Sequence, residues 1–131
     1  MNLDEYMHAN SDLSICDAAV LKHQKEIESA NFFLDILKKI KTAINNVGKR
    51  TRSKAQKQRD WSFLDRMCPG SDHAHAAFLE GYEAAVRDAK AKRTEYKRAL
   101  KTAKKRQETQ KEVFDKLTVL YGFAVQEEIN D

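Results

Sequence analysis

Apolar side chains recur every three or four residues from Leu13 onwards, which is the spacing of one face of an α-helix. Eight of the ten positions in the series are apolar. The series is Leu13, Cys16, Val20, His23, Ile27, Ala30, Leu34, Leu37, Lys41 and Ile44. It predicts one long helix over residues 12–47, preceded by an acidic lead-in at residues 1–11. Gly48 suits the left-handed position that ends many helices, so we expect the helix to stop there.

Residues 49–70 are predicted to be a basic connection that contains one short helix. Its first half, residues 49–59, has six basic residues, no acidic ones and a single apolar side chain. A compact apolar group follows and predicts the short helix, packed against the core. The group consists of Trp61, Phe63, Leu64 and Met67. The run Cys68-Pro69-Gly70 then ends this helix, because proline and glycine interrupt regular structure.

A second long helical pattern covers residues 71–128. Its three- and four-residue steps pass through Phe78, Tyr82, Ala85, Ala89, Lys92, Tyr96, Ala99, Ala103, Arg106, Gln110, Val113, Leu117, Leu120 and Ala124. The pattern is weakest between residues 104 and 112, where Thr109 and Glu112 have the spacing of a capping box. Two interpretations therefore stay open: one helix of about 55 residues, or a break near residue 107.

Composition agrees with few, long helices. The chain of 131 residues contains one proline and four glycines, too few for the turns of a sheet protein, and 34% of its residues are charged. We therefore predict an all-α fold: a long antiparallel helical hairpin or a small helical bundle with coiled-coil character. By its length the chain is expected to form a single helical domain over residues 1–131.

The two long helices are predicted to differ in length. At 1.5 Å per residue the first spans roughly 52 Å and an unbroken last helix roughly 85 Å. An antiparallel first helix would then cover its partner only to about residue 107, leaving the apolar residues 113–125 without a neighbour. Exposed apolar strips of this kind mark interfaces, so we expect a homodimer or higher oligomer. The expected interface residues are Val113, Phe114, Leu117, Leu120, Tyr121 and Ala124.

Charge is strongly segregated although the net charge is only +4. Residues 1–35 contain seven acidic and two basic side chains, whereas residues 87–111 contain eleven basic and three acidic ones. A row of lysine and arginine is suited to a phosphate backbone, which makes nucleic acid a candidate partner. The candidate nucleic-acid-binding residues are Lys49, Arg50, Arg52, Lys54, Lys57, Arg59, Arg93, Lys97, Lys101 and Lys104.

The alternative is a solvated helix face whose cations pair with acidic residues inside the fold. In the expected hairpin, residues 87–107 lie beside residues 12–32, which carry Asp12, Asp17, Glu26 and Glu28. The segment 49–59 has no such acidic neighbour.

No residue pattern predicts catalysis, a cofactor or a metal site. Cys68, His73 and His75 could supply three zinc ligands, but their spacing matches no established finger and a fourth ligand is missing nearby. Cys16 and His23 are two helical turns apart, about 10 Å along the axis, which is too far for a hydrogen bond. Motifs for phosphate loops, nucleophilic serines and zinc proteases are absent from the sequence. We therefore expect a protein that is not an enzyme.

The sequence also favours an intracellular, cytoplasmic location. Its first six residues are acidic where a signal peptide would be basic, and Cys16 and Cys68 have no C-x-x-C spacing. No strictly apolar run is longer than the four residues Ala18 to Leu21, far fewer than the ~20 residues that cross a membrane. No membrane partner is therefore expected.

Together these features predict a non-enzymatic helical module for protein–protein interaction: an adaptor, a scaffold-like assembly factor or an inhibitor. The expected partners are a second copy of the chain, another protein, or both. The alternative is a nucleic-acid-binding protein that uses the basic segment 49–59 and the basic stripe 87–111 on phosphate.

Overall fold

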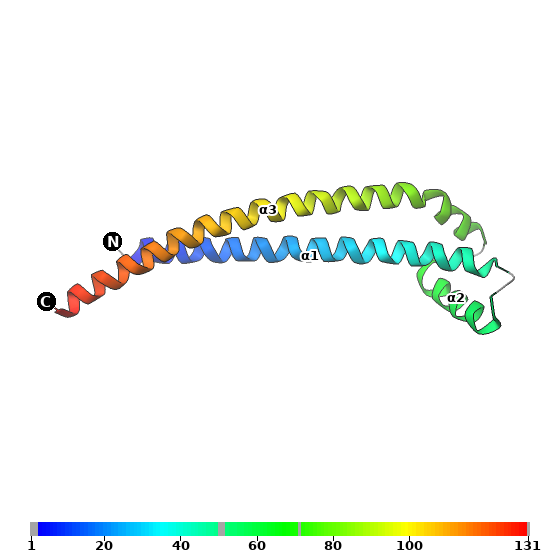
Figure 1. The fold of residues 1–131 in the computed structure, drawn as a ribbon, viewed down its shortest axis with the longest axis horizontal. Coiled ribbons are helices and arrows are strands. Elements are labelled where there is room, and N and C mark those ends of the chain that lie inside the picture. Colours follow the sequence, from blue (N-terminus) through cyan, green and yellow to red (C-terminus); the bar gives the residue numbers. More distant parts are fainter. Residues whose placement is uncertain (1–2, 50–51, 71, 131) are drawn as a thin grey trace. The chain divides into compact units, whose positions relative to one another are not determined.

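The computed structural model describes residues 3–49, 52–70 and 72–130 (Figure 1). It contains three helices: α1 (Leu3–Val47, 45 residues), α2 (Lys54–Met67, 14 residues) and α3 (Asp72–Asn130, 59 residues). No strand occurs within those three ranges. The predicted all-α fold is therefore confirmed, and helix covers more of the chain than the sequence pattern indicated.

The chain packs as two compact units. The terminal unit contains Met1–Ile27 and Glu95–Asp131, and the central unit contains Glu28–Thr94. Helices α1 and α3 each contribute to both units, whereas α2 belongs to the central unit alone. That residues 1–131 act as one domain stays a prediction.

In the terminal unit, α1 and α3 pair in antiparallel fashion. The Tyr6 ring stacks on the Tyr121 ring with centroids 5.1 Å apart, and its centroid lies 5.3 Å from that of Phe114. Further along α1, the Asp17 carboxylate accepts a hydrogen bond from the Gln107 side chain at 2.7 Å. Contacts that advance along α1 therefore step backwards along α3, as the predicted hairpin requires.

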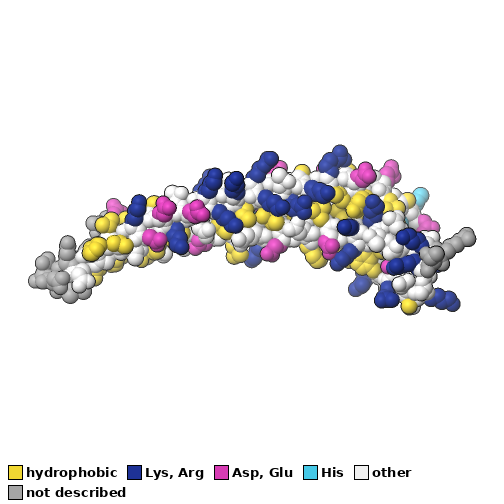
Figure 2. Space-filling view, in the orientation of Figure 1, with side chains coloured by type: hydrophobic (Ala, Val, Ile, Leu, Met, Phe, Trp, Pro, Cys, Tyr) yellow, Lys and Arg dark blue, Asp and Glu magenta, His cyan; other side chains and the backbone are white. Residues whose placement is uncertain are grey.

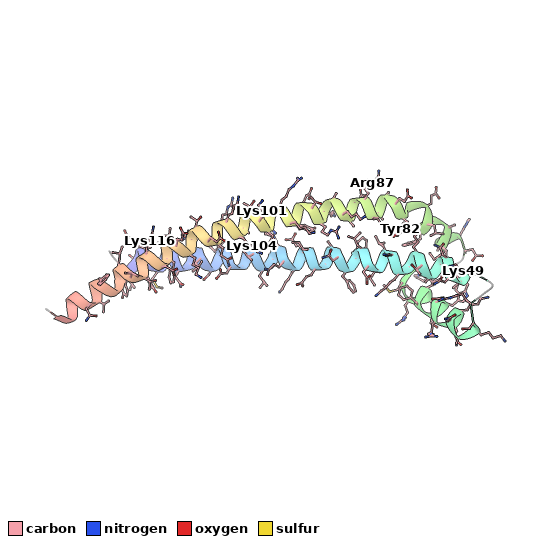
Figure 3. The ribbon with its side chains drawn as sticks, viewed as in Figure 1. Lys49, Tyr82, Arg87, Lys101, Lys104 and Lys116 are labelled. Carbon is pink, nitrogen blue, oxygen red and sulfur yellow. The ribbon has the colours of Figure 1, made fainter. Side chains whose placement is uncertain are left out.

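The same antiparallel order holds in the central unit. Arg93 donates a hydrogen bond to the side-chain oxygen of Asn31 at 3.1 Å. The Lys41 ammonium lies 4.4 Å from the centre of the Tyr82 ring, a cation–π contact that joins α1 to α3. Figure 3 shows Tyr82 on the side of α3 that faces α1.

The hydrophobic core lies in the central unit, where α2 packs on the end of α1. Its buried members are Ile40, Ala43, Ile44 and Leu64. Among these the Leu64 side chain is fully buried, and Phe63 and Phe78 pack against the cluster from α2 and α3. Much of the core that the sequence pattern indicated is thus present. Trp61 differs, because 41% of its surface is exposed and its ring lies beside His75, with centroids 5.7 Å apart.

Local sequence accounts for both ends of α2. Ser53 forms a capping box with Gln56. The Ser53 hydroxyl accepts a hydrogen bond from the backbone amide of Gln56, and the side-chain oxygen of Gln56 accepts one from the backbone amide of Ser53. The helix therefore begins well before the apolar group that predicted it. At the other end Gly70 has φ +132°, a conformation that glycine adopts without strain.

One predicted helix boundary was wrong, and of the two interpretations left open for the last helix the unbroken one is correct. Helix α1 begins at Leu3, so the expected acidic lead-in is helical, and the Ser14 hydroxyl donates to the Asn10 carbonyl inside the helix. Helix α3 runs without a break through residue 107, and the Thr109 hydroxyl donates to the Lys105 carbonyl instead of capping a new helix. The hydroxyls of Ser14 and Thr109 each donate to a backbone carbonyl one turn earlier, so neither residue interrupts its helix.

Candidate functional site: two flanks of the terminal unit

The seam by which α3 meets α1 in the terminal unit departs by one residue from the predicted series at alternate steps, whereas Ala103, Gln110 and Leu117 lie on it as predicted. Arg106, Val113 and Leu120 were expected on the seam, but all three are exposed. The positions that turn towards α1 are Ala103, Gln107, Gln110, Phe114, Leu117 and Tyr121. The departure consists of four-residue steps from Ala103, Gln110 and Leu117 where three-residue steps were predicted.

The expected interface residues therefore separate into two groups. Phe114 and Tyr121 contact Tyr6 within the unit, and Leu117 is half-buried. Val113 and Leu120 remain exposed, by 41% and 53%. The side chain of Ala124 lies outside the described residues. Their use as an interface stays a prediction.

The terminal unit has little interior of its own. Among its described residues the buried apolar side chains are Ala9, Val20 and Ala103, two of which are alanine. Two glutamines, Gln107 and Gln110, also lie on the seam. Large apolar side chains are instead exposed: Leu3, Met7, Ile15, Leu21, Val113, Val119, Leu120, Phe123 and Val125. The fully buried interior of this unit is therefore small.

One groove of the terminal unit is lined mainly by apolar and small side chains. It has a volume of about 310 Å³ and is lined by Ile15, Cys16, Ala19, His23, Ala99, Thr102, Ala103 and Arg106. Val113 and Leu120 follow Arg106 at seven-residue intervals, which places them on the same edge of α3 in a helix pair. We call the surface formed by Ile15, Ala19, Ala99, Val113 and Leu120 the apolar flank.

A second groove lies on the other side of the pair and is polar. It is lined by Leu13, Asp17, Gln107, Glu108, Lys111, Phe114 and Asp115. Asp17 is two residues from both Ile15 and Ala19, so it points about 200° away from them around α1. Lys104 and Lys97 precede Lys111 at seven-residue intervals and continue this edge of α3.

We call the surface formed by Lys97, Lys101, Lys104 and Lys111 the basic flank. All four side chains are exposed, and Lys101 lies one turn from its neighbours on both sides. Figure 3 labels Lys101 and Lys104 on successive turns of α3, and Figure 2 shows dark blue side chains gathered along the middle of that helix. The structure thus places the predicted Lys97, Lys101 and Lys104 together.

The expected neutralisation of the basic stripe by α1 does not occur through ion pairs. In the described part of the chain no lysine or arginine of residues 87–111 forms an ion pair. Asp17 accepts instead from the uncharged Gln107, and Glu26 lies 3.3 Å from the His23 ring nitrogen. Arg93 is half-buried and bonded to Asn31, so it is not part of the exposed stripe.

The predicted cations of the basic connection, in the central unit, do not form one exposed row. Arg52 is half-buried and pairs with Asp60 at 3.2 Å, and Arg50 lies outside the described residues. The remaining predicted cations lie in the connection or on α2: Lys49, Lys54, Lys57 and Arg59. Figure 3 labels Lys49 just beyond the end of α1. The expectation that segment 49–59 has no acidic neighbour was therefore wrong for Arg52.

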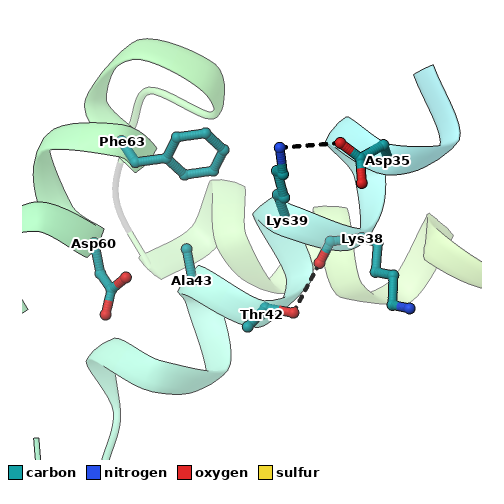
Figure 4. A pocket seen from close by; sticks show the side chains of 7 residues that line it. All are labelled: Asp35, Lys38, Lys39, Thr42, Ala43, Asp60 and Phe63. Carbon is teal, nitrogen blue, oxygen red and sulfur yellow. Dashed lines mark hydrogen bonds and ion pairs between the residues drawn. The ribbon is translucent and has the colours of Figure 1, made fainter. Parts of the chain in front are cut away.

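A shallow groove of the central unit mixes charges of both signs (Figure 4). It is lined by Asp35, Lys38, Lys39, Thr42, Ala43, Asp60 and Phe63. Lys39 pairs with Asp35 at 3.0 Å, and the Thr42 hydroxyl donates to the backbone carbonyl of Lys38. The groove thus contains one ion pair of its own, and its other acidic group, Asp60, pairs with Arg52.

The residues considered for metal chemistry do not converge. Cys68 packs against the hydrophobic core, His75 is buried beside Trp61, and His73 is exposed. No group of three or more potential ligand side chains is close enough to hold a metal ion in the described ranges. Nor does any helix there have the length and apolar character needed to cross a membrane.

Sequence reasoning missed the contribution of α1 to the apolar flank and that of Lys111 to the basic flank. Lys111 was detectable, because Lys97, Lys104 and Lys111 share a seven-residue spacing. Ile15 and Ala19 were not, since their role depends on which edge of α1 faces the groove. No family model, curated protein or solved structure matches this chain.

Proposed function

We propose that this chain is a non-enzymatic helical interaction module that self-associates through the apolar flank. The observation that supports this most strongly is the sparse interior of the terminal unit. Its described residues bury Ala9, Val20 and Ala103, while nine large apolar side chains are exposed. Side chains of this kind gain stability when another surface removes them from water.

A second copy of the chain is the occupant that we propose for the apolar flank. On α3 the flank runs from Ala99 to Leu120, about 32 Å at 1.5 Å per residue. Small side chains in the groove, Ala19 and Ala99 among them, let a helix approach closely, and larger ones on its edges can enter the partner's groove. Two-fold symmetry brings the same strip from both copies together, and the product is a four-helix bundle.

The test is the native mass of a double variant, Val113→Lys with Leu120→Lys. Both side chains are exposed, so lysine is accommodated in the monomer, whereas in the dimer it would bury charge. We expect wild-type protein at tens of micromolar to be dimeric by light scattering and the variant to be monomeric with its helical circular dichroism retained.

Leu21→Lys is the matched control. Leu21 is 52% exposed, almost the same as Leu120 at 53%. It lies two residues beyond Ala19 and points about 200° away from the groove. This control is expected to remain dimeric. A wild-type protein that stays monomeric at tens of micromolar would contradict self-association and leave a different protein as the occupant, and equal loss in both variants would contradict the choice of flank.

A further inference from the structure

The basic flank carries a second binding function. We propose that it binds the phosphate backbone of double-stranded nucleic acid without reading its sequence. The flank presents Lys97, Lys101, Lys104 and Lys111 along one side of a continuous helix. From the first to the last of these residues the helix rises about 21 Å, a distance over which duplex DNA carries about twelve phosphate charges.

The surroundings of the flank intensify its positive charge. Residues 97–105 contain five basic side chains and no acidic one, and Arg106 lines the apolar groove instead. In the terminal unit, Gln107 lies opposite Asp17 and Phe114 opposite Tyr6, so residues 97–106 lie beside approximately residues 18–27 of α1. That segment adds the exposed Lys25, whereas Lys22 follows Ile15 by seven residues and so lies on the apolar edge of α1.

Asp17 and Glu26 have contacts other than the flank, whereas Glu108 and Asp115 line the polar groove beside Lys111. Asp17 accepts a hydrogen bond from Gln107, and Glu26 is held by His23 on the same helix. Glu108 does interrupt the row, one turn after Lys104. Because the lysines have no ion-pair partner in the described part of the chain, they remain available to release counterions from a phosphate backbone.

The absence of aromatic side chains from the basic flank indicates which kind of polyanion it binds. Single-stranded nucleic acid is held largely by aromatic side chains on which bases stack, and residues 97–111 contain no aromatic residue. Tyr96, which precedes them, is half-buried on the seam. A straight row of cations with no stacking platform matches the regular backbone of a duplex. An acidic protein is the competing polyanion.

The two flanks lie on opposite edges of the helix pair, so the nucleic-acid proposal does not rest on self-association. Asp17 and Lys111 line the polar groove, whereas Ile15 and Ala19 line the apolar one. A variant of the basic flank can therefore be tested with its oligomeric state unchanged, and the failure of either proposal can be told from that of the other.

The experiment measures binding of the full chain to a fluorescent mixed-sequence duplex by anisotropy, over a range of salt concentrations starting at about 50 mM. The test variant carries Lys→Gln at positions 97, 101, 104 and 111, and the matched control carries Lys→Arg at the same four positions. Each neutralised phosphate contact contributes about 0.9 to the slope of log affinity against log salt. We therefore expect the glutamine variant to lose about 3–4 from the slope, and the arginine variant to keep it.

Competition with polyglutamate identifies the class of polyanion. The proposal predicts that unlabelled duplex displaces the probe at concentrations at which polyglutamate of equal charge does not. Displacement by both at the same concentration would overturn it in favour of an acidic protein surface. Absence of binding at about 50 mM salt, where phosphate contacts are strongest, would also overturn it, as would an unchanged salt slope in the glutamine variant.

Discussion

Gln107 donates a hydrogen bond from its Nε2 atom to Oδ1 of Asp17 across 2.7 Å, and this contact defines how α1 and α3 pair in the terminal unit. A hairpin whose first helix began at residue 12 would have placed residue 107 beside the start of that helix. Because α1 begins at Leu3, it continues past this contact and reaches Tyr121 through the ring of Tyr6. The early start of α1 therefore covers part of the strip that was expected to lack a neighbour.

The ring of Tyr6 should be important for the end of this pairing. Tyr6→Ala removes ring contacts with both Phe114 and Tyr121, and we expect a loss of about 1–3 kcal/mol, since each aromatic pair contributes about 0.5–1.5 kcal/mol beyond area burial. Met7→Ala is the control: Met7 is 56% exposed, and its truncation should change stability by no more than about 0.5 kcal/mol. Denaturant unfolding followed by circular dichroism measures both. Equal effects would show that Tyr6 does not anchor the pair.

Leu64 should be the most sensitive apolar position of α2. It is fully buried within the cluster that includes Ile40 and Ile44. Leu64→Ala should reduce the free energy of unfolding by about 2–5 kcal/mol, because it removes apolar contacts and leaves a cavity. Met67→Ala lies one turn further on α2 at a position that is 40% exposed, and it should cost clearly less. A loss under about 1 kcal/mol for Leu64→Ala would mean that α2 does not pack as described.

Two glycines should respond to alanine in opposite directions. Gly70 has φ +132°, and a Cβ atom there would lie 2.9 Å from the Cβ of Ala74, so Gly70→Ala should destabilise the protein by more than about 1 kcal/mol. Gly81 lies inside α3, where an added Cβ meets nothing within 4 Å. Gly81→Ala should therefore stabilise by about 0.5–1 kcal/mol through helix propensity. Thermal unfolding compares them, and a stabilising Gly70→Ala would contradict the turn geometry.

The sequence pattern was sufficient for the fold class because most of the evidence for a helix lies within a few turns. Helix α1 stops at Val47 as expected, although the expected left-handed conformation of Gly48 was wrong, because Gly70 is the glycine with a positive φ among the described residues. The end of α2 before Pro69 depends on residues whose backbone preferences are local. Packing between Ile40, Ile44 and Leu64 was also predictable, since these residues lie close to the connection between two helices.

The positions of the flanks could not be predicted, because they depend on which of two adjacent residues of α3 faces α1. A one-residue displacement of the seam exposes Val113 and Leu120, and turns Phe114 and Tyr121 towards Tyr6. Val113 and Phe114, like Leu120 and Tyr121, are adjacent apolar residues, so the sequence does not determine which member of each pair faces α1. The pairing of Asp17 with Gln107 likewise depends on where α1 begins.

The two units should differ in how their hydrogen exchange depends on protein concentration. Backbone amides exchange through local opening, whose free energy rises with the apolar surface that holds the helices together. The central unit has a buried cluster around Ile40 and Leu64, so its amides should show protection that is independent of concentration. The terminal unit has no comparable cluster among its described residues, and its protection should come largely from the second copy.

Hydrogen exchange measured by mass spectrometry can distinguish the protection of the two units. Peptides from residues 3–27 and 95–123 report on the terminal unit, and peptides from residues 28–94 report on the central unit. Dilution below the dissociation constant should accelerate exchange in the terminal peptides and leave the central ones unchanged, as expected when binding stabilises one unit by mass action. Val113→Lys with Leu120→Lys should give the fast terminal pattern at every concentration, and Leu21→Lys should retain the wild-type dependence. Concentration-independent protection of the terminal peptides in wild-type protein would show that α1 and α3 hold each other without a partner, and the sparse interior of this unit would then no longer argue for self-association.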